Sequence, residues 1–413
     1  MHPHDWNGIV PWPRCRAIAR WLQLRSGEYM PANRSAEVRK NVAEIAAEFA
    51  SARGDRIQRR TLSRIDFDRL DDAGFLLTGV PIERGGLWRG LAESVREYAE
   101  LVRVLAQGDP CVALVAAMHP SVLTFWLAVD EPRLNAAAWR AQRAECIDTA
   151  LQGHWWGTLI SEPGSGGDLL RTRTRAEPSG TDYRLSGEKH FGSGSGITSF
   201  MITTGRVDGE PAPELFVIDV RDRPWDGSAG LTLRKSWDGH GMIATQSHAF
   251  LLDRCPAVRA ASGDAFATAA PVVSQLTPML FAAVIVGIAR NAIALARDRL
   301  RQRSADLKAY EQVTWVQVTN TAWLIEQAYE GALRVIESGS GGLLAAARAK
   351  ATIGALAEQC FTDLSRVLGG ASYARDTPFG QWAEDVRALG FLRPPWGFAF
   401  EQLLKLDLAE TRT

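Results

Sequence analysis

Apolar residues recur at helical spacing along the first part of the chain. Within 35–57, four apolar residues lie three or four positions apart: Val38, Val42, Ile45 and Phe49. This spacing predicts an amphipathic helix, with Ser35 as a candidate N-cap. A second helix is predicted over 91–109, and between the two a helix should end at Gly74 and continue as an extended segment. We therefore predict a helical N-terminal domain over residues 1–150.

The pattern changes between residues 151 and 262. Four short segments there are rich in residues that favour strands and are separated by Gly, Asp and Pro turns: 182–196, 199–207, 214–222 and 246–253. Short strands at such spacing predict a compact antiparallel sheet domain.

Longer helical patterns return from residue 263 to the end of the sequence at 413. Leu280, Val284 and Ile288 mark one apolar stripe, and a further helix should run from Leu343 to Leu368 and end at Gly369-Gly370. Long amphipathic helices with short links predict a C-terminal four-helix bundle. The order helices, sheet, helices predicts an α+β, mostly α chain with segregated domains, not a Rossmann sheet.

Composition narrows the class of protein. The chain has 413 residues, with 47 Lys and Arg against 47 Asp and Glu, so it lacks the basic excess typical of nucleic-acid binders. The longest apolar run, 278–289, is too short to span a bilayer, and the first residues do not resemble a signal peptide. Five scattered cysteines without CxxC spacing indicate reduced thiols. We expect a cytoplasmic protein with neither nucleic acid nor membrane as a partner.

The segment LISEPGSGGDL, residues 159–169, is neither a strand nor a helix in character. A run of small residues between apolar ends leaves the backbone open to close approach, although a Ser-Glu-Pro-Gly stretch by itself is most often only a turn.

Four motifs in order, together with the three zones, resemble the acyl-CoA dehydrogenase superfamily of flavoproteins. They are GFLLTGVPIERGG at 74–86, SEPGSGGD at 161–168, YRLSGEKHFGSGSG at 183–196 and LSRVLGGASYARDTPFGQWAEDVRA at 364–388. The resemblance covers most of the chain from about residue 40. It implies the acyl-CoA dehydrogenase fold, a bound FAD (with FMN as the alternative), and a homodimer or homotetramer packed through the bundle.

The resemblance also implies residue roles around a flavin held between the sheet domain and the bundle. By position, the contacts to the isoalloxazine ring fall on Thr158, Ile160, Ser161, Phe191 and Ser193, with the Ser193 hydroxyl near N5. Other positions match the glycine pair that lets the bundle approach the cofactor, Gly369 and Gly370, and a serine that usually touches the substrate, here Gly167. The spacing of the histidines predicts no metal site.

Two of these assignments have an ordinary structural alternative. Gly369-Gly370 is a normal helix stop, and a lone Phe in a strand, such as Phe191, is usually a core residue.

The sequence departs from the family at the catalytic base. Dehydrogenation of an acyl thioester needs a carboxylate to remove the α-proton. Of the two positions where family members carry that Glu, one is Arg393 and the other is Thr277. Arginine stays protonated and threonine is not a carboxylate, so the usual catalytic Glu is absent.

One branch of the superfamily, the group D flavin monooxygenases, shares these losses. In that branch a serine matching Ser193 stabilises the oxygen adduct of the flavin, and a histidine commonly stands where this chain has Arg393. We assign Ser193 and Arg393 as candidate catalytic residues: Arg393 can bind a carboxylate, a phenolate or a flavin phosphate, or it can pair structurally with Asp385. Both readings of Arg393 remain open.

The sequence therefore predicts a flavin-dependent oxidoreductase of the acyl-CoA dehydrogenase type that acts on a small acyl-thioester or aromatic substrate stacked on the flavin. Its partner would be an electron-transfer flavoprotein or a flavin reductase. The alternatives are a group D flavin monooxygenase and a non-catalytic scaffold that binds an acyl thioester.

Overall fold

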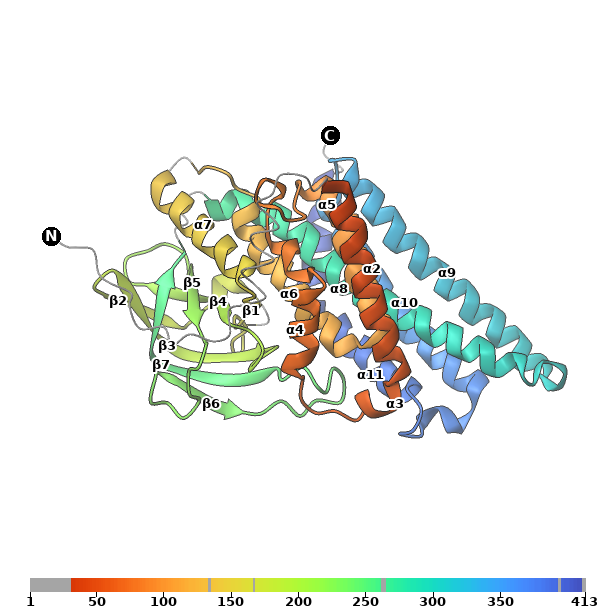
Figure 1. Cartoon of the computed structure of the whole chain (residues 1–413). Coiled ribbons are helices and arrows are strands. Elements are labelled where there is room, and N and C mark those ends of the chain that lie inside the picture. Colours follow the sequence, from red (N-terminus) through yellow and green to blue (C-terminus); the bar gives the residue numbers. More distant parts are fainter. Residues whose placement is uncertain (1–30, 133–134, 166–167, 261–264, 393–394, 411–413) are drawn as a thin grey trace.

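The computed structural model describes residues 31–132, 135–165, 168–260, 265–392 and 395–410. The sheet domain lies at one side of the molecule and the C-terminal helices at the other, with most of the N-terminal helices between them (Figure 1). Two predicted site residues, Gly167 and Arg393, lie outside the described residues.

The N-terminal part is helical, as predicted. Its elements are α2 (Pro31–Ser51), α3 (Arg53–Arg56), α4 (Arg64–Asp72), η1 (Phe75–Gly79), η2 (Ile82–Arg84), α5 (Leu91–Gly108), α6 (Pro110–Leu127) and α7 (Ala136–Leu151). The predicted apolar stripe of α2 is buried, with Val42 completely so. Such a stripe packs because it removes apolar surface from water on one face of the helix.

Two local predictions in this part were wrong. Ser35 is not an N-cap: it lies inside α2, and its buried hydroxyl donates to Glu97 on α5. Gly74 does end the helical run with a φ of 89°, but the chain then forms the 3-10 turns η1 and η2 instead of an extended segment. The η1 turn buries Phe75 and Leu76.

The central strands form one seven-stranded sheet. They are β1 (Trp156–Thr158), β2 (Arg175–Ser179), β3 (Asp182–Gly192), β4 (Phe200–Val207), β5 (Glu214–Asp219), β6 (Leu231–Lys235) and β7 (His248–Arg259). The order is β1-β4-β2-β3-β7-β5, with β6 on β7 and a further pairing of β4 with β5. Most strand pairs are antiparallel, as predicted, but β1 and β2 each pair in parallel with β4.

The pairing of β3 with β7 is irregular where it approaches the candidate site. Lys189 lies opposite Phe250, and the register shifts before Gly192 pairs with His248. Within that shift Phe191 has a φ of 57°. A bulge of this kind redirects a side chain at the end of a strand.

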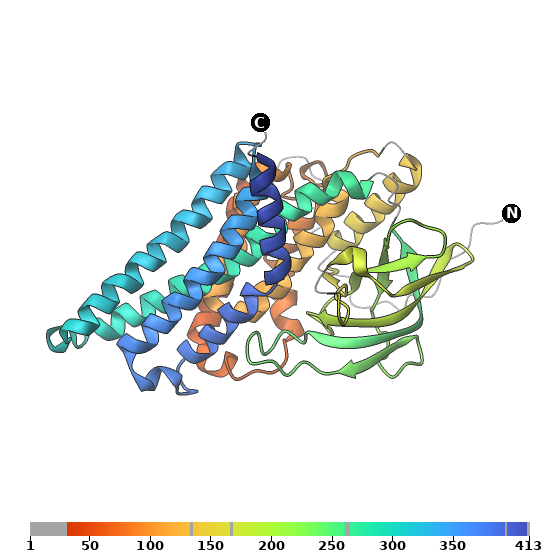
Figure 2. The same cartoon turned by 180° about the vertical axis from the view of Figure 1, so that it is seen from behind.

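The C-terminal part consists of α8 (Ala265–Arg301), η4 (Ser304–Asp306), α9 (Ala309–Glu337), α10 (Gly342–Leu368), η5 (Gly370–Tyr373), α11 (Phe379–Gly390) and α12 (Trp396–Glu410). The predicted helix Leu343–Leu368 is confirmed to within one residue by α10. Seen from behind, the long helices α8, α9 and α10 run side by side, and α12 crosses beside α10 (Figure 2).

The apolar side chains form separate cores. One core cluster is shared by the N-terminal helices and the bundle, and a second one fills the sheet domain. Two helices, α6 and α8, are long and apolar enough to cross a membrane, but 94 % and 78 % of their most apolar windows are buried inside the fold. Packing in the shared core accounts for their composition.

Candidate functional site

The small-residue loop 159–165 is fixed to β3 by a buried ion pair. Lys189 has no exposed surface, and its Nζ lies 2.6 Å from Glu162 Oε1 and 3.1 Å from Thr204 Oγ1. The Lys189 ammonium also donates to the carbonyl of Ile160, at 3.3 Å. This pair was not predicted from the sequence, although both residues stand inside motifs that carry the resemblance, Ser-Glu-Pro-Gly and Gly-Glu-Lys.

Glu162 is held from several sides. Its carboxylate accepts hydrogen bonds from the Arg173 and Thr174 main-chain N–H groups at 2.7 and 3.2 Å and from the Thr174 hydroxyl at 2.7 Å. Burial raises the pKa of Glu162, but Lys189 and these donors outweigh it, so that the pKa is lowered from its usual value. Burial lowers the pKa of Lys189 to about 8, against the attraction of Glu162. Both groups are therefore charged at neutral pH.

This pairing fixes the main chain at the predicted flavin-contact residues. Ser161 bridges to His190, whose N–H donates to the Ser161 carbonyl at 2.7 Å. Thr158 and Ile160 are buried beside it, at the end of β1. The structure thus brings Thr158, Ile160, Ser161 and the 190–193 turn onto one edge of the sheet domain.

The turn after β3 carries Phe191 and Ser193. Phe191 is 48 % exposed, and the Trp237 ring lies edge-on to it with the ring centroids 6.0 Å apart. It is therefore not the ordinary core aromatic of the alternative reading. A positive φ in a non-glycine aromatic residue is strained, and such strain concentrates at functional sites. Ser193 is buried, and its Oγ lies 2.8 Å from Ser247 Oγ.

The loop between β6 and β7 connects this turn to the bundle. Its Met242 N–H donates to Asp385 Oδ1 on α11 at 2.6 Å. Gln381 of the same helix donates to Asp385 and to the His240 carbonyl, at 2.8 and 3.2 Å. Gly241 lies so close to the Glu384 carbonyl that a Cβ would not fit. Asp385 therefore contacts this loop; Arg393, its partner in the structural alternative, lies outside the described residues.

Asp385 is an unusual carboxyl because it is buried and no cation of the described residues pairs with it. Burial raises its pKa to about 7, against the hydrogen bonds from Met242 and Gln381 and with a smaller contribution from Asp109 and Glu384. Close to neutral pH the group exchanges its proton within the contact between the sheet domain and the bundle.

The structure does not bring Gly369 and Gly370 to the sheet edge. They follow α10, whose ribbon lies on the bundle side of the molecule (Figures 1 and 2). Gly369 has a φ of 76°, and a Cβ built on either glycine meets no atom within 4 Å. Gly369 is a left-handed helix stop, as the ordinary reading holds. The open space beside both residues leaves room for a cofactor or a second subunit.

Thr277 on α8 has no chemical partner. Its Oγ1 is buried without a hydrogen bond among the described residues, between the buried neighbours Leu276 and Pro278. A hydroxyl in such a setting cannot replace a carboxylate base.

The sheet edge fits a flavin. An exposed ring on a strained residue, a main chain held by buried ion pairing and a buried hydroxyl beside them are the kinds of group that bind a flat polar ring system. Thr158, Ile160, Ser161, Phe191 and Ser193 would supply these contacts. Among the described residues no group of three or more His, Cys, Asp or Glu side chains is placed to hold a metal ion.

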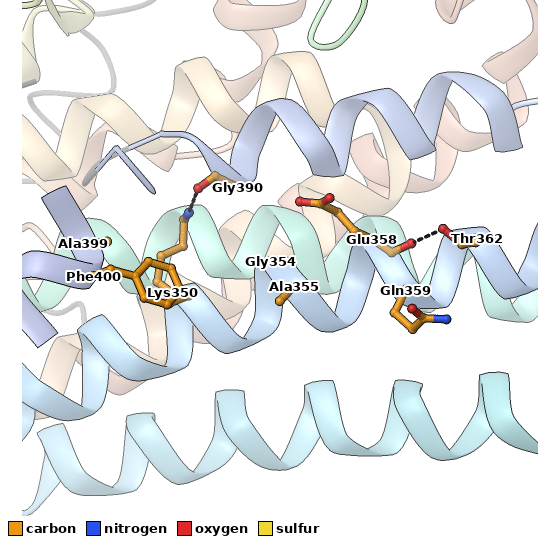
Figure 3. Close-up of a pocket in the computed structure, with 10 residues that line it drawn as sticks. Lys350, Gly354, Ala355, Glu358, Gln359, Thr362, Gly390, Ala399 and Phe400 are labelled. Carbon is orange, nitrogen blue, oxygen red and sulfur yellow. Dashed lines mark hydrogen bonds between the residues drawn. The ribbon is translucent and has the colours of Figure 1, made fainter. Parts of the chain in front are cut away.

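Two cavities are found among the described residues, one away from the sheet edge and one beside it at Leu159 and Ser195. One, of about 390 Å³, lies between α10, α11 and α12 (Figure 3). At its end Lys350 donates to the carbonyls of Leu389 and Gly390 at 2.8 and 3.3 Å, which stabilises the carboxyl end of α11; burial lowers the pKa of Lys350 to about 8. The other, of about 820 Å³, is lined by residues that include His154, Ser195 and Arg221.

Comparison with known sequences gives consistent results. Residues 276–393 match the family described as "Acyl-CoA dehydrogenase, C-terminal domain". The chain is 28 % identical over 349 residues to the amino sugar nitrososynthase DnmZ of Streptomyces peucetius, covering 79 % of this chain and 82 % of that protein. It is 28 % identical over 380 residues to an L-evernosamine nitrososynthase of Micromonospora, covering 86 % and 84 %.

A solved structure supports the fold. KijD3 in complex with FMN and dTDP-3-amino-2,3,6-trideoxy-4-keto-3-methyl-D-glucose superposes with a TM-score of 0.74 at 22 % identity, covering 94 % of this chain and 96 % of that one. Other relatives are monooxygenases and acyl-CoA dehydrogenases.

Proposed function

Because this chain belongs to the acyl-CoA dehydrogenase superfamily of flavin enzymes, we propose that it is a flavin-dependent monooxygenase supplied by a separate flavin reductase. The reduced flavin provides two electrons, one atom of dioxygen enters the substrate, and the other leaves as water. The substrate class we propose is a small molecule with a nucleophilic nitrogen, an amino sugar first among them.

One observation carries the choice of monooxygenation over dehydrogenation. The sheet half offers described residues that would hold a flavin, but neither position for the base holds a carboxylate: one is Thr277, whose hydroxyl has no partner among the described residues, and the other is Arg393. Removal of an α-proton from an acyl thioester needs a base of that kind. Oxygen transfer to an amine does not.

The relatives support the substrate class. The first three are nitrososynthases, two of them named for amino sugars, at 25 to 28 % identity. Acyl-CoA dehydrogenases match less of this chain or at lower identity, such as the cyclohexane-1-carbonyl-CoA dehydrogenase of Syntrophus aciditrophicus, which covers 56 % of it.

The residues of this chain divide the work as follows. The main chain of Ile160 and Ser161 and the Thr158 hydroxyl would bind the polar edge of the flavin, Phe191 would lie beside the ring, and Ser193 would lie near N5. The bound flavin supplies the electrons and the reaction with dioxygen. Arg393 would hold an anionic group of the substrate or of the flavin phosphate. We expect FMN to bind at least as well as FAD, because the family's Arg-x-x-Phe-Gly support for the adenine half is missing from 299–312.

We also propose a homo-oligomer packed through the bundle. Exposed apolar side chains recur on one face of α12, at Phe400, Leu404 and Leu408, and along α9, at Tyr310 and Trp323. Contiguous apolar surface of this kind marks an interface. Size-exclusion chromatography with light scattering should give a dimer or a tetramer, and a monomer at micromolar concentration would contradict the proposal.

The function is tested by supplying reduced flavin from a separate reductase. Protein, reductase, NADH, FMN or FAD and air are mixed with a panel of nucleotide-linked amino sugars and acyl-CoAs, and the products are identified by mass spectrometry. We expect an oxygenated amine that requires both proteins. An unsaturated thioester, formed with flavin bleaching in the absence of air, would instead identify a dehydrogenase. Failure to bind either flavin would identify a scaffold.

A further inference from the structure

Behind Ser193 a chain of hydroxyl groups leads to a main-chain carbonyl. Ser193 Oγ lies 2.8 Å from Ser247 Oγ, which lies 2.7 Å from Thr245 Oγ1. Thr245 Oγ1 lies 2.8 Å from the carbonyl oxygen of Met242. All four residues are buried, and Thr245 has no exposed surface, so these groups must satisfy one another rather than exchange partners with bulk water.

The direction of every proton in the chain follows from the carbonyl. A carbonyl oxygen can only accept, so Thr245 must donate its single hydroxyl proton to Met242 O. The Thr245 hydroxyl can then only accept at its contact with Ser247, and Ser247 donates there. Because the Ser247 proton is used, Ser193 donates to Ser247.

The Met242 carbonyl, at which the chain of hydroxyl groups ends, is held in place by further hydrogen bonds. Trp237 Nε1–H also donates to Met242 O, at 3.0 Å, and the Thr245 N–H donates to it at 3.2 Å. On its other side the Met242 N–H is held by Asp385, and the residue has a φ of 52°. The Thr245 carbonyl accepts from the Gly194 N–H at 2.8 Å. A main-chain hydrogen bond therefore also joins the segment that carries Thr245 to the turn that carries Ser193.

From this geometry we infer that Ser247 and Thr245 are positioning residues, which turn the Ser193 proton inward and leave its lone pairs facing the flavin. The inference rests on the proposed function, which places Ser193 at N5. An outward lone pair accepts from an N–H donor, and N5 carries a hydrogen in reduced flavin but only a lone pair in oxidised flavin. The hydroxyl chain therefore makes the site bind reduced flavin more tightly than oxidised flavin.

With this order of protons, the N5 hydrogen of reduced flavin meets a lone pair of Ser193 and forms a hydrogen bond. In oxidised flavin a lone pair on N5 faces the Ser193 lone pair instead. A hydrogen bond made in place of two opposed lone pairs is worth on the order of tenfold in binding, or somewhat more in a dry site. Removing Ser247 frees the Ser193 proton to rotate outward and donate, so that oxidised flavin becomes an equal or better partner.

The experiment compares the dissociation constants of FMN and of chemically reduced FMN for the full-length protein, under argon, by equilibrium dialysis. We expect the wild type to favour reduced FMN by about tenfold or more. Ser247→Ala and Thr245→Val should lose most of that preference. Thr245→Ser, which keeps the hydroxyl, should restore it.

Ser195→Ala is the matched control, because Ser195 is a buried serine of the same turn whose hydroxyl donates to the Gly192 carbonyl outside the chain. It should keep the wild-type ratio, and thermal unfolding of each variant confirms that it is folded. If Ser247→Ala and Thr245→Val keep the wild-type ratio, or if the wild type shows no preference, this inference is overturned and the proposed function stands. If the wild type binds neither form, both are overturned.

Discussion

The sheet half and the bundle half of the site differ in how their polar groups are satisfied. On the sheet side, Lys189 and Glu162 are buried and paired, and the Ser193 hydroxyl is the end of a closed hydrogen-bond chain. On the bundle side, Thr277 has a buried hydroxyl without a partner among the described residues, and Gly370 faces open space.

We interpret this difference as a division between cofactor binding, in the sheet half, and the chemistry of the reaction, in the bundle half. A site built to hold a flat cofactor needs fixed polar groups, and the sheet half supplies them. The bundle half is where the dehydrogenases of the family carry their base, and this chain has lost it there. Under the proposed function, the fold would keep its cofactor site while the reaction differs.

The largest effect should come from breaking the pairing in the sheet half. Lys189→Met leaves the Glu162 carboxylate buried without its cation and should lower the free energy of unfolding by about 3–5 kcal/mol. Flavin affinity should fall with it, because the loop 159–165 loses its anchor. Urea unfolding and flavin titration measure the two effects.

Arg254→Met is the matched control for that variant. Arg254 pairs with Glu177 in the same sheet domain, at 3.1 Å, but both side chains are exposed, so its loss should change stability by less than about 1 kcal/mol. If the two variants lose stability equally, Lys189 does not have the anchoring role that we assign to it.

Substitution of Asp385 should weaken the contact between the sheet half and the bundle half. Asp385→Ala removes the acceptor of the buried Met242 N–H and should cost about 1–3 kcal/mol, whereas Asp385→Asn keeps an oxygen there and should cost less. The measurement is the midpoint of urea unfolding at neutral pH.

The raised pKa of Asp385 also fixes the sign of a pH dependence. The usual pKa of an aspartate is 3.8. Between that pH and about 7, the folded chain holds a proton on Asp385 that the unfolded chain has released. This group's contribution to stability is therefore present at low pH and is lost as pH rises through that window. Asp385→Asn should flatten that part of the profile. An unchanged slope would show that Asp385 does not titrate there.

A smaller effect is expected from the unpartnered hydroxyl in the bundle half. Thr277→Val replaces it with a methyl group of the same shape and should raise the free energy of unfolding by about 1 kcal/mol. Turnover should be unchanged, because the residue is not a base. A large loss of turnover would return Thr277 to the reaction and weaken the contrast between the two halves.

The smallest effect on folding should come from Gly370→Ala. The added Cβ meets no atom of this chain within 4 Å, so stability should change by less than about 1 kcal/mol. If a cofactor or a second subunit fills that space, flavin affinity or the oligomer will weaken at constant stability. If both are unaffected, Gly370 is only part of a helix stop.

The sequence predicted the order helices, strands, helices and α10 almost to the residue, because these depend on periodicity. It did not predict the turns after Gly74 or the interior position of Ser35, since the partners of these segments, such as Glu97 on α5, are distant in sequence. The same reason hid the Lys189–Glu162 pair and the hydroxyl chain behind Ser193. Glu162 and Lys189 lie 27 positions apart, and Ser193 and Ser247 lie 54 apart, so only the fold places them in contact.

The central claim is that this flavin site carries dioxygen chemistry. Its most direct test is to run the reductase-coupled reaction under isotopically labelled dioxygen and to weigh the product. The account predicts one labelled oxygen atom in the product, which disappears when the reductase or the flavin is omitted. A product without label, formed equally well under argon with an acyl-CoA as substrate, would contradict it.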